Sequence, residues 1–225
     1  INSLDALKHI LVTGNATRLA GLEKPWTLYE DFIADHEPIV EFPDIEETAA
    51  AATCYTSGTT GNPKGVVYSH RTIYLHSLAS MATNAFALGN SDKILLLPPM
   101  FHANAWGLPY SGWLAGADFV LPGPNLQPEA IRRMIRGTAP TFTATVPTIL
   151  NDLLRIDAKD PVDMQSFRVI VVGGSAVSEG LIAEVERSWN VPLIQGWGMT
   201  ETSPLCVLSH PPADTSNEEA RRLRA

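Results

Sequence analysis

The stretch Tyr-Thr-Ser-Gly-Thr-Thr-Gly-Asn-Pro-Lys-Gly occupies residues 55–65 and is rich in glycine and hydroxyl side chains. Its glycines can adopt positive φ and let the backbone approach a ligand closely. Its hydroxyl and backbone N–H groups can line a concave anion site, and Lys64 adds a mobile positive charge. Strand-like apolar segments lie on both sides, at residues 49–55 and 66–68. This arrangement predicts a phosphate-binding loop in an α/β protein.

The Walker P-loop of nucleotide hydrolases, G-x-x-x-x-G-K-[ST], does not fit this stretch. When its lysine is aligned with Lys64, Gly58 falls into place, but Pro63 precedes the lysine. Gly65 stands where a Ser or Thr would hold magnesium. A flexible surface turn is the structural alternative, because short motifs often match by chance. The loop alone therefore leaves phosphate binding and a simple turn open.

The composition narrows the class of protein. With 225 residues, of which 45% are hydrophobic, the chain can build a substantial core. The formal net charge is −8 and no basic stretch carries interleaved aromatics, which excludes nucleic acid as a partner. No segment approaches the roughly 18 apolar residues of a membrane span, and no signal-peptide pattern begins the chain, so we expect a cytoplasmic protein. Cys54 and Cys206 lack metal-site spacing and are expected to be buried, inert thiols.

Short apolar runs alternate with helical patterns, which predicts an α/β fold with a mostly parallel sheet flanked by helices. The expected strands are residues 9–12, 51–56, 93–97, 118–121, 141–146, 168–172 and 192–194. Thr27 has capping-box spacing to Glu30 and should start a short helix. Longer helices are expected over residues 70–87 and 147–156.

Three further clusters follow predicted strands, where ligand crevices form in α/β proteins. They are Pro-Pro-Met-Phe-His-Ala-Asn-Ala-Trp at 98–106, Val-Gly-Gly-Ser-Ala at 172–176 and Gln-Gly-Trp-Gly-Met-Thr-Glu-Thr at 195–202. In the last of these, Trp197 can stack on a flat ring and Glu201 can offer an oxygen ligand to magnesium. Taken singly, each cluster could also be a helix cap or an ordinary turn.

In this order, the four clusters resemble the adenylate-forming superfamily, which comprises acyl-CoA synthetases, luciferases and peptide-synthetase adenylation domains. The segment Phe-His-Ala-Asn-Ala-Trp at 101–106 is most similar to the medium- and long-chain fatty acyl-CoA synthetases. The resemblance covers about residues 45–212 and implies part of an acyl-CoA-synthetase-like N-terminal domain. It implies an AMP-forming ligase that activates a fatty carboxylate with ATP as acyl-adenylate and transfers the acyl group to coenzyme A.

The resemblance also implies roles for particular residues. The phosphates of ATP would be held by Thr56, Ser57, Gly58, Thr59, Thr60, Gly61 and Lys64. Thr56 and Glu201 would bind Mg²⁺, and Thr200 would contact the α-phosphate. The adenine slot would be formed by Gly174, Gln195, Gly196 and Trp197. His102 would lie beside the reacting carboxylate, while Ala103 and Trp106 would lie at the nucleotide end of the acyl tunnel, with the indole as a gate.

We expect residues 1–48 to be the end of a preceding subdomain and a linker, 49–212 to be the ATP/AMP-binding core, and 213–225 to be a polar tail that is mobile or only marginally helical. Members of the superfamily continue into a hinge and a small domain that supplies a catalytic lysine, so the resemblance implies a fragment with little activity of its own. Two alternatives stay open. The acyl acceptor could be a carrier-protein thiol or an amine, or the chain could be a nucleotide-binding module without turnover. Acyl chain length and oligomeric state, including a homodimer, are also open.

Overall fold

The computed structural model describes residues 7–14, 23–34, 36–58, 61–212 and 214–225. The chain divides into two units, residues 1–45 and 46–225, so the expected division after residue 48 falls within the second. The first unit pairs two short parallel strands, β1 (Leu11–Val12) and β2 (Thr27–Leu28), and continues into α1 (Tyr29–Ala34). Thr27 therefore lies in a strand, and the predicted helix begins two residues later.

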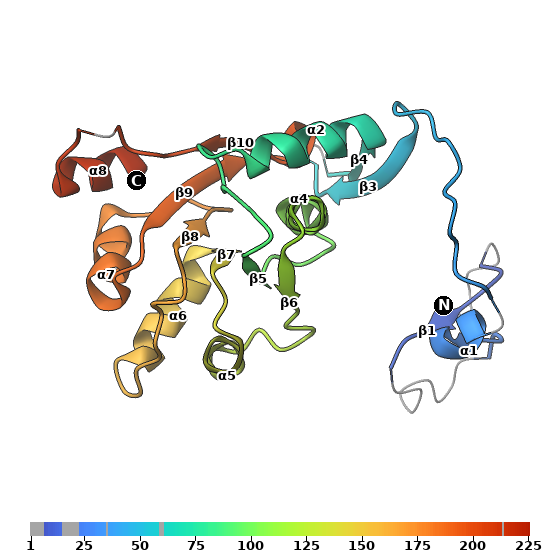
Figure 1. Cartoon of the computed structure of the whole chain (residues 1–225), viewed down its shortest axis with the longest axis horizontal. Coiled ribbons are helices and arrows are strands. Elements are labelled where there is room, and N and C mark those ends of the chain that lie inside the picture. The colour runs from blue at the N-terminus through green and yellow to red at the C-terminus, as the bar shows by residue number, and fades with distance from the viewer. Residues whose placement is uncertain (1–6, 15–22, 35, 59–60, 213) are drawn as a thin grey trace. The chain divides into compact units, whose positions relative to one another are not determined.

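The second unit is built on a six-stranded sheet with the order β10-β9-β8-β7-β5-β6 (Figure 1). Its strands are β5 (Lys93–Leu96), β6 (Asp118–Val120), β7 (Phe142–Thr145), β8 (Val169–Val172), β9 (Leu193–Gly198) and β10 (Leu205–Leu208). The strands from β6 to β9 pair in parallel, and only β10 runs antiparallel to its neighbour. The predicted α/β fold with a mostly parallel sheet is confirmed.

Helices cover both faces of this sheet. Alternate residues of each strand therefore pack into two separate hydrophobic cores. Ile170 and Val172 pack with α5 (Pro128–Thr138), α6 (Pro147–Asp157) and α7 (Glu179–Trp189). The intervening Val169 and Val171 pack into a second core with Phe142 and with Leu108 of α4 (Leu108–Ala115). Figure 1 shows α5, α6 and α7 on one side of the strands and α4 on the other.

The glycine loop lies at the tip of a hairpin that is separate from the main sheet. Its strands β3 (Ala50–Thr56) and β4 (Lys64–Ser69) are antiparallel, so the loop joins two strands rather than a strand and a helix. Helix α2 (His70–Met81) follows β4 at once. The Ser69 hydroxyl caps it by accepting a hydrogen bond from the N–H of Thr72 at 3.2 Å, and the N–H of Ser69 donates to the Thr72 hydroxyl at 3.0 Å. This capping box fixes where the chain leaves the hairpin.

Helix α2 ends at Met81, although the sequence predicts helix to residue 87. Ala82 is extended, with ψ 151°, and the chain turns back until the N–H of Phe86 donates to the carbonyl oxygen of Ser80 at 2.9 Å. Phe86 is thereby 2% exposed. Burying an aromatic side chain is worth more than the small helix propensity of the intervening residues. Packing therefore overrides the local preference.

Strand β9 is longer than predicted because an unpredicted strand, β10, pairs with its second half. The predicted segment ended at residue 194, whereas Gly196, Trp197 and Gly198 pair with β10.

Cys206 lies in β10 at the edge of the sheet and is exposed, so the prediction that both cysteines are buried holds only for Cys54. Among the helices that the structure describes, none has the length and apolar character of a membrane span.

The C-terminal segment, where at most a marginal helix was expected, contains a helix. Helix α8 (Asn217–Arg224) packs beside α7, where Arg221 and Arg224 pair with Glu186. Arg224 also donates to the carbonyl oxygen of Leu193 at 2.9 Å and is 6% exposed. The sequence offered few apolar side chains here, and the docking depends instead on ion pairs and on the stems of the arginines.

Candidate functional site

A cavity of about 470 Å³ lies where β5 and β8 end at their carboxyl ends. Its walls come from the β3–β4 hairpin, the segment after β5, the turn after β8 and the β9–β10 hairpin, so the four sequence clusters meet in one place. The predicted residues that line it are Thr56, Ser57, Gly58, Lys64, His102, Ala103, Trp106, Gly174, Gly196, Trp197, Thr200 and Glu201. This is the crevice position expected for a ligand of an α/β sheet.

The other predicted residues fall into two groups. Gly61 and Gln195 are not among the residues that line the cavity. The amide of Gln195, in the orientation that satisfies its hydrogen bonds, donates to the carbonyl oxygen of Arg224 at 3.1 Å. Its side chain therefore faces α8. Thr59 and Thr60 fall outside the described residues.

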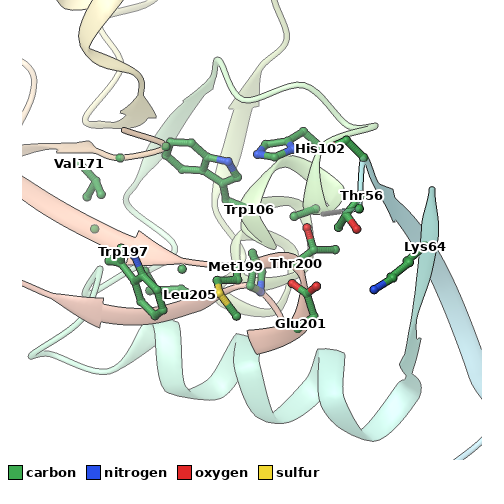
Figure 2. Close-up of a pocket in the computed structure, with 18 of the residues that line it drawn as sticks. Thr56, Lys64, His102, Trp106, Val171, Trp197, Met199, Thr200, Glu201 and Leu205 are labelled. Atoms are coloured by element: carbon green, nitrogen blue, oxygen red, sulfur yellow. The ribbon is translucent and has the colours of Figure 1, made fainter. Parts of the chain in front are cut away.

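The polar end of the cavity gathers groups suited to phosphate and magnesium. Figure 2 shows Thr56, Lys64, Thr200 and Glu201 at this end, with Val171 and Trp197 toward the other. The Thr56 hydroxyl and the Glu201 carboxylate are hard oxygen donors, which suit Mg²⁺. The described residues contain no group of three or more His, Cys, Asp or Glu side chains placed to hold a metal. A magnesium ion here would therefore take further oxygen ligands from phosphate and water, as it commonly does.

The segment that carries His102 and Trp106 has a left-handed backbone. The short helical element α3 (Ala103–Trp106) has φ between 46° and 59° at each residue, which costs energy for any residue with a Cβ atom. Asn104 accepts a hydrogen bond from the Cys54 thiol at 3.2 Å, which ties the turn to β3. His102 makes no side-chain capping bond, contrary to the simple helix-cap interpretation. Backbone strain of this kind is often found at functional sites, which is consistent with a functional role for this segment.

Glycines let three segments close around the cavity. A Cβ atom on Gly173 would lie 2.7 Å from the carbonyl oxygen of Gly196, and one on Gly198 would lie 2.2 Å from that of Pro204. A Cβ atom on Gly174 would lie 3.6 Å from the indole of Trp106, which therefore rests against this turn. A side chain at Gly173 or Gly198 would push these segments apart, so the glycines allow the walls of the cavity to approach one another closely.

A partly buried histidine and a buried tyrosine outside the motifs support the walls. The N–H of Leu205, which lines the cavity, donates to Nε2 of His76 at 3.1 Å. Burial lowers the pKa of His76, so the ring stays neutral and can accept this bond. Burial, with smaller contributions from Cys54, Glu201 and Tyr110, raises the pKa of Tyr68 to about 12, and its hydroxyl keeps its proton near neutral pH.

Sequence reasoning missed part of the lining. Gly173, Gly198 and Met199 stand beside predicted residues within the same clusters. Phe86, Val171, Pro204 and Leu205 also line the cavity but belong to no cluster. Their apolar side chains predict only burial in the core, and nothing in the sequence distinguished them from residues that pack against the sheet.

Comparison with known families accounts for this arrangement. The AMP-binding enzyme family matches residues 3–223. The chain therefore belongs to the AMP-binding enzyme family, in agreement with the resemblance carried by the four clusters.

Known relatives indicate the branch of that family to which the chain is similar. The medium-chain-fatty-acid–CoA ligase of Ectopseudomonas oleovorans is 39% identical over 99% of this chain, which spans 41% of that ligase. Among solved structures, the anthranilate CoA ligase AuaEII in complex with anthranoyl-AMP is similar with a TM-score of 0.83 at 25% identity, over 95% of this chain and 40% of its own.

A second solved structure is O-succinylbenzoate coenzyme A synthetase of Bacillus subtilis in complex with ATP and magnesium ion. It has a TM-score of 0.71 at 25% identity, over 89% of this chain and 41% of its own. The chain thus spans less than half the length of each of these three relatives.

Proposed function

We propose that the chain contributes the nucleotide-binding core of an ATP-dependent, AMP-forming ligase that activates a fatty carboxylate and transfers it to coenzyme A. The observation that carries the proposal is the meeting of four separate sequence clusters in one cavity, with a polar end and an apolar end. The similarity to a fatty-acid–CoA ligase supports the substrate class. Since the chain spans 41% of that relative, the activity of the whole protein is a proposal.

In the first half-reaction, a carboxylate oxygen of the acid attacks the α-phosphorus of ATP, and the bond to pyrophosphate breaks. Lys64 and the glycine loop from Thr56 hold the β- and γ-phosphates, while Thr200 contacts the α-phosphate. Magnesium, held by Thr56, Glu201 and the phosphates, would neutralise negative charge on the departing pyrophosphate. Such a displacement depends on positioning and on charge neutralisation.

His102 lies between the polar and apolar parts of the cavity, where a ring N–H can steady the carboxylate as it attacks (Figure 2). Trp106 and Ala103 border the path of the acyl chain. Gly174, Gly196 and Trp197 form the adenine slot, in which the indole of Trp197 stacks on the base. In the second half-reaction, the thiolate of coenzyme A attacks the acyl carbonyl carbon and AMP leaves.

Fatty-acid-dependent exchange of pyrophosphate into ATP tests the first half-reaction, and thioester formation with coenzyme A tests the second. We expect both in the protein that carries this sequence, and we expect the 225-residue chain alone to give weak exchange. Exchange without thioester would favour a carrier-protein thiol or an amine as acceptor. ATP binding without exchange in the whole protein would make the chain a binding module. We propose a cytoplasmic location because ATP and coenzyme A are available there.

A further inference from the structure

A second cavity, of about 220 Å³, lies against the first. It is lined by Thr83, Ala85, Phe86, Ala87, Arg168, Val169, Val171, Pro192, Ile194, Leu208 and His210. Phe86 and Val171 line both cavities and so form a shared wall between them. Neither belongs to a sequence cluster, and the proposed chemistry uses neither.

We propose that Phe86 is the residue that limits the length of the acyl chain, and that the second cavity is the space a longer chain would enter if the ring were removed. This inference rests on the proposed function and adds a specificity-determining residue to it. Val171 forms the fixed part of the wall because it belongs to the buried strand β8, where it is 3% exposed.

The apolar end of the first cavity is suited to an alkyl chain. Trp106, Val171 and Leu205 lie away from Lys64 and Glu201, which are at the polar end (Figure 2). Phe86 also lines the cavity and packs in the same core cluster as Val171, Trp106 and Leu205. An alkyl chain gains about 0.8 kcal/mol for each methylene that leaves water, so its tail favours the apolar end while its carboxylate stays near His102. The tail then meets the wall formed by Phe86 and Val171.

Both the ring and the backbone of Phe86 are held by neighbouring residues. It packs on Phe142 with the ring centroids 5.3 Å apart. Its backbone N–H donates to Ser80 at 2.9 Å, and its carbonyl oxygen accepts from Arg168 at 2.8 Å. Arg168 is itself paired with Asp92 at 2.8 Å. Because its backbone is bonded at both polar atoms and its ring packs on Phe142, Phe86 acts as a rigid stop rather than as a movable lid.

Asp92 is well suited to hold this arrangement. It is 5% exposed and accepts hydrogen bonds from Thr141 at 2.6 Å and from the N–H of Gly89 at 2.9 Å, in addition to those from Arg168. The guanidinium of Arg168 is thus occupied by Asp92 and by the carbonyl oxygens of Phe86 and Ala87. With its arginine engaged in this way, the second cavity is better suited to an apolar tail than to an independent anion.

The test measures binding of a series of acyl-adenylate analogues to the protein that carries this sequence, by calorimetry. The probes are N-acylsulfamoyl adenosines whose straight acyl chains grow by two carbons at each step. In the wild type, affinity should rise by about fourfold per methylene and then stop rising at a defined length. Phe86→Ala and Phe86→Leu should move that limit to longer chains. Adding Ile194→Phe to Phe86→Ala fills the second cavity and should return the limit toward the wild-type length.

The matched control is Phe167→Leu, which alters a phenylalanine that is also buried, at 4% exposed, in the core on the opposite face of the sheet. It should keep the wild-type limit, and thermal unfolding shows which variants are folded. If all probes bind but Phe86→Leu and Phe86→Ala leave the limit unchanged, Phe86 is not the stop and the inference fails while the proposed function stands. If the wild type binds no probe of any length, the proposed function fails and the inference with it.

Discussion

The hydroxyl of Tyr68 donates a 2.5 Å hydrogen bond to the backbone carbonyl oxygen of Thr200. Tyr68 belongs to β4, in the hairpin that carries Lys64, whereas Thr200 begins the short 3₁₀ helix Thr200–Thr202 that carries Glu201. The bond therefore joins the two segments of the polar end, which lie far apart in sequence. Tyr68 is 4% exposed, so water does not readily replace it as the donor.

Replacing Tyr68 with phenylalanine should loosen the polar end without emptying the core. The Thr200 carbonyl loses its donor, and we expect a loss of about 1 kcal/mol in the free energy of unfolding. We also expect a several-fold rise in the dissociation constant of ATP with Mg²⁺, because Glu201 is no longer held relative to Lys64. Urea unfolding and calorimetry measure the two effects. Tyr74→Phe, on the exposed face of α2, is the control, and equal affinity in both variants would contradict the role given to Tyr68.

The bond between His76 and Leu205 should make stability depend on pH. Burial places the pKa of His76 in the folded state below its ordinary value of 6.5, so the unfolded chain binds more protons between the two values. This contribution to stability is present above about pH 6.5 and is lost as the pH falls through the folded pKa. Free energies of unfolding measured from neutral to mildly acidic pH should therefore decline.

His76→Gln supplies the control for that decline, because a glutamine carbonyl can accept the N–H of Leu205 and does not titrate. Its stability should change less over the same pH range than that of the wild type. His70→Gln, which alters an exposed histidine on the same helix, should keep the wild-type slope. An unchanged slope in His76→Gln would show that other groups cause the acid sensitivity.

Lys64→Ala and Glu201→Gln should impair adenylation while leaving the fold intact. Both side chains are exposed and lie at the polar end of the cavity, so their loss removes little packing. We expect at least a tenfold fall in fatty-acid-dependent pyrophosphate exchange, since each removes a charge that balances the phosphates or binds magnesium. The variants are made in the protein that carries this sequence, with Lys159→Ala and Glu184→Gln as exposed controls. Near-normal exchange in either test variant would remove the role given to that residue.

The sequence predicted the polar half of the site better than the apolar half. Few structural roles require glycines, hydroxyl groups and a lysine to occur together, as they do before residue 66. Thr56 and Lys64 from this stretch line the same cavity as Glu201. Phe86 could not be found in this way, because a phenylalanine within a helical pattern predicts only a buried side chain. Its place at the wall depends on the end of α2 at Met81, which tertiary packing decides.

The parallel part of the sheet could also be predicted from the sequence. Buried parallel strands such as β8 are continuous apolar runs that local sequence reveals. In contrast, β10 includes Cys206 and Val207, which are exposed at the edge, and its pairing with Gly196 to Gly198 is a relationship between segments. No local pattern carries that information, so β9 was predicted too short.

Glu186→Gln should release α8 from α7. Burial acts to raise the pKa of Glu186, but hydrogen bonds from Arg224 and Arg221 outweigh it and hold this pKa below its usual value. Losing the carboxylate leaves Arg224, whose side chain is 7% exposed, without its charged partner. We expect about 2 kcal/mol less stability and faster tryptic cleavage after the arginines of α8. Glu184→Gln on the same helix should cleave like the wild type, and equal rates in both would mean that packing alone holds α8.

Nucleotide binding by the 225-residue chain should be weak and should require magnesium. ATP carries roughly four negative charges at neutral pH, whereas Lys64 and His102 are the basic side chains among the described residues that line the cavity. A divalent cation shared with Glu201 supplies the missing positive charge. Calorimetry with Mg²⁺ should give a measurable signal that chelation abolishes, and Glu201→Gln should weaken it more than Glu184→Gln. Tight binding that survives chelation would contradict this account, since it would require cationic groups that the described lining does not contain.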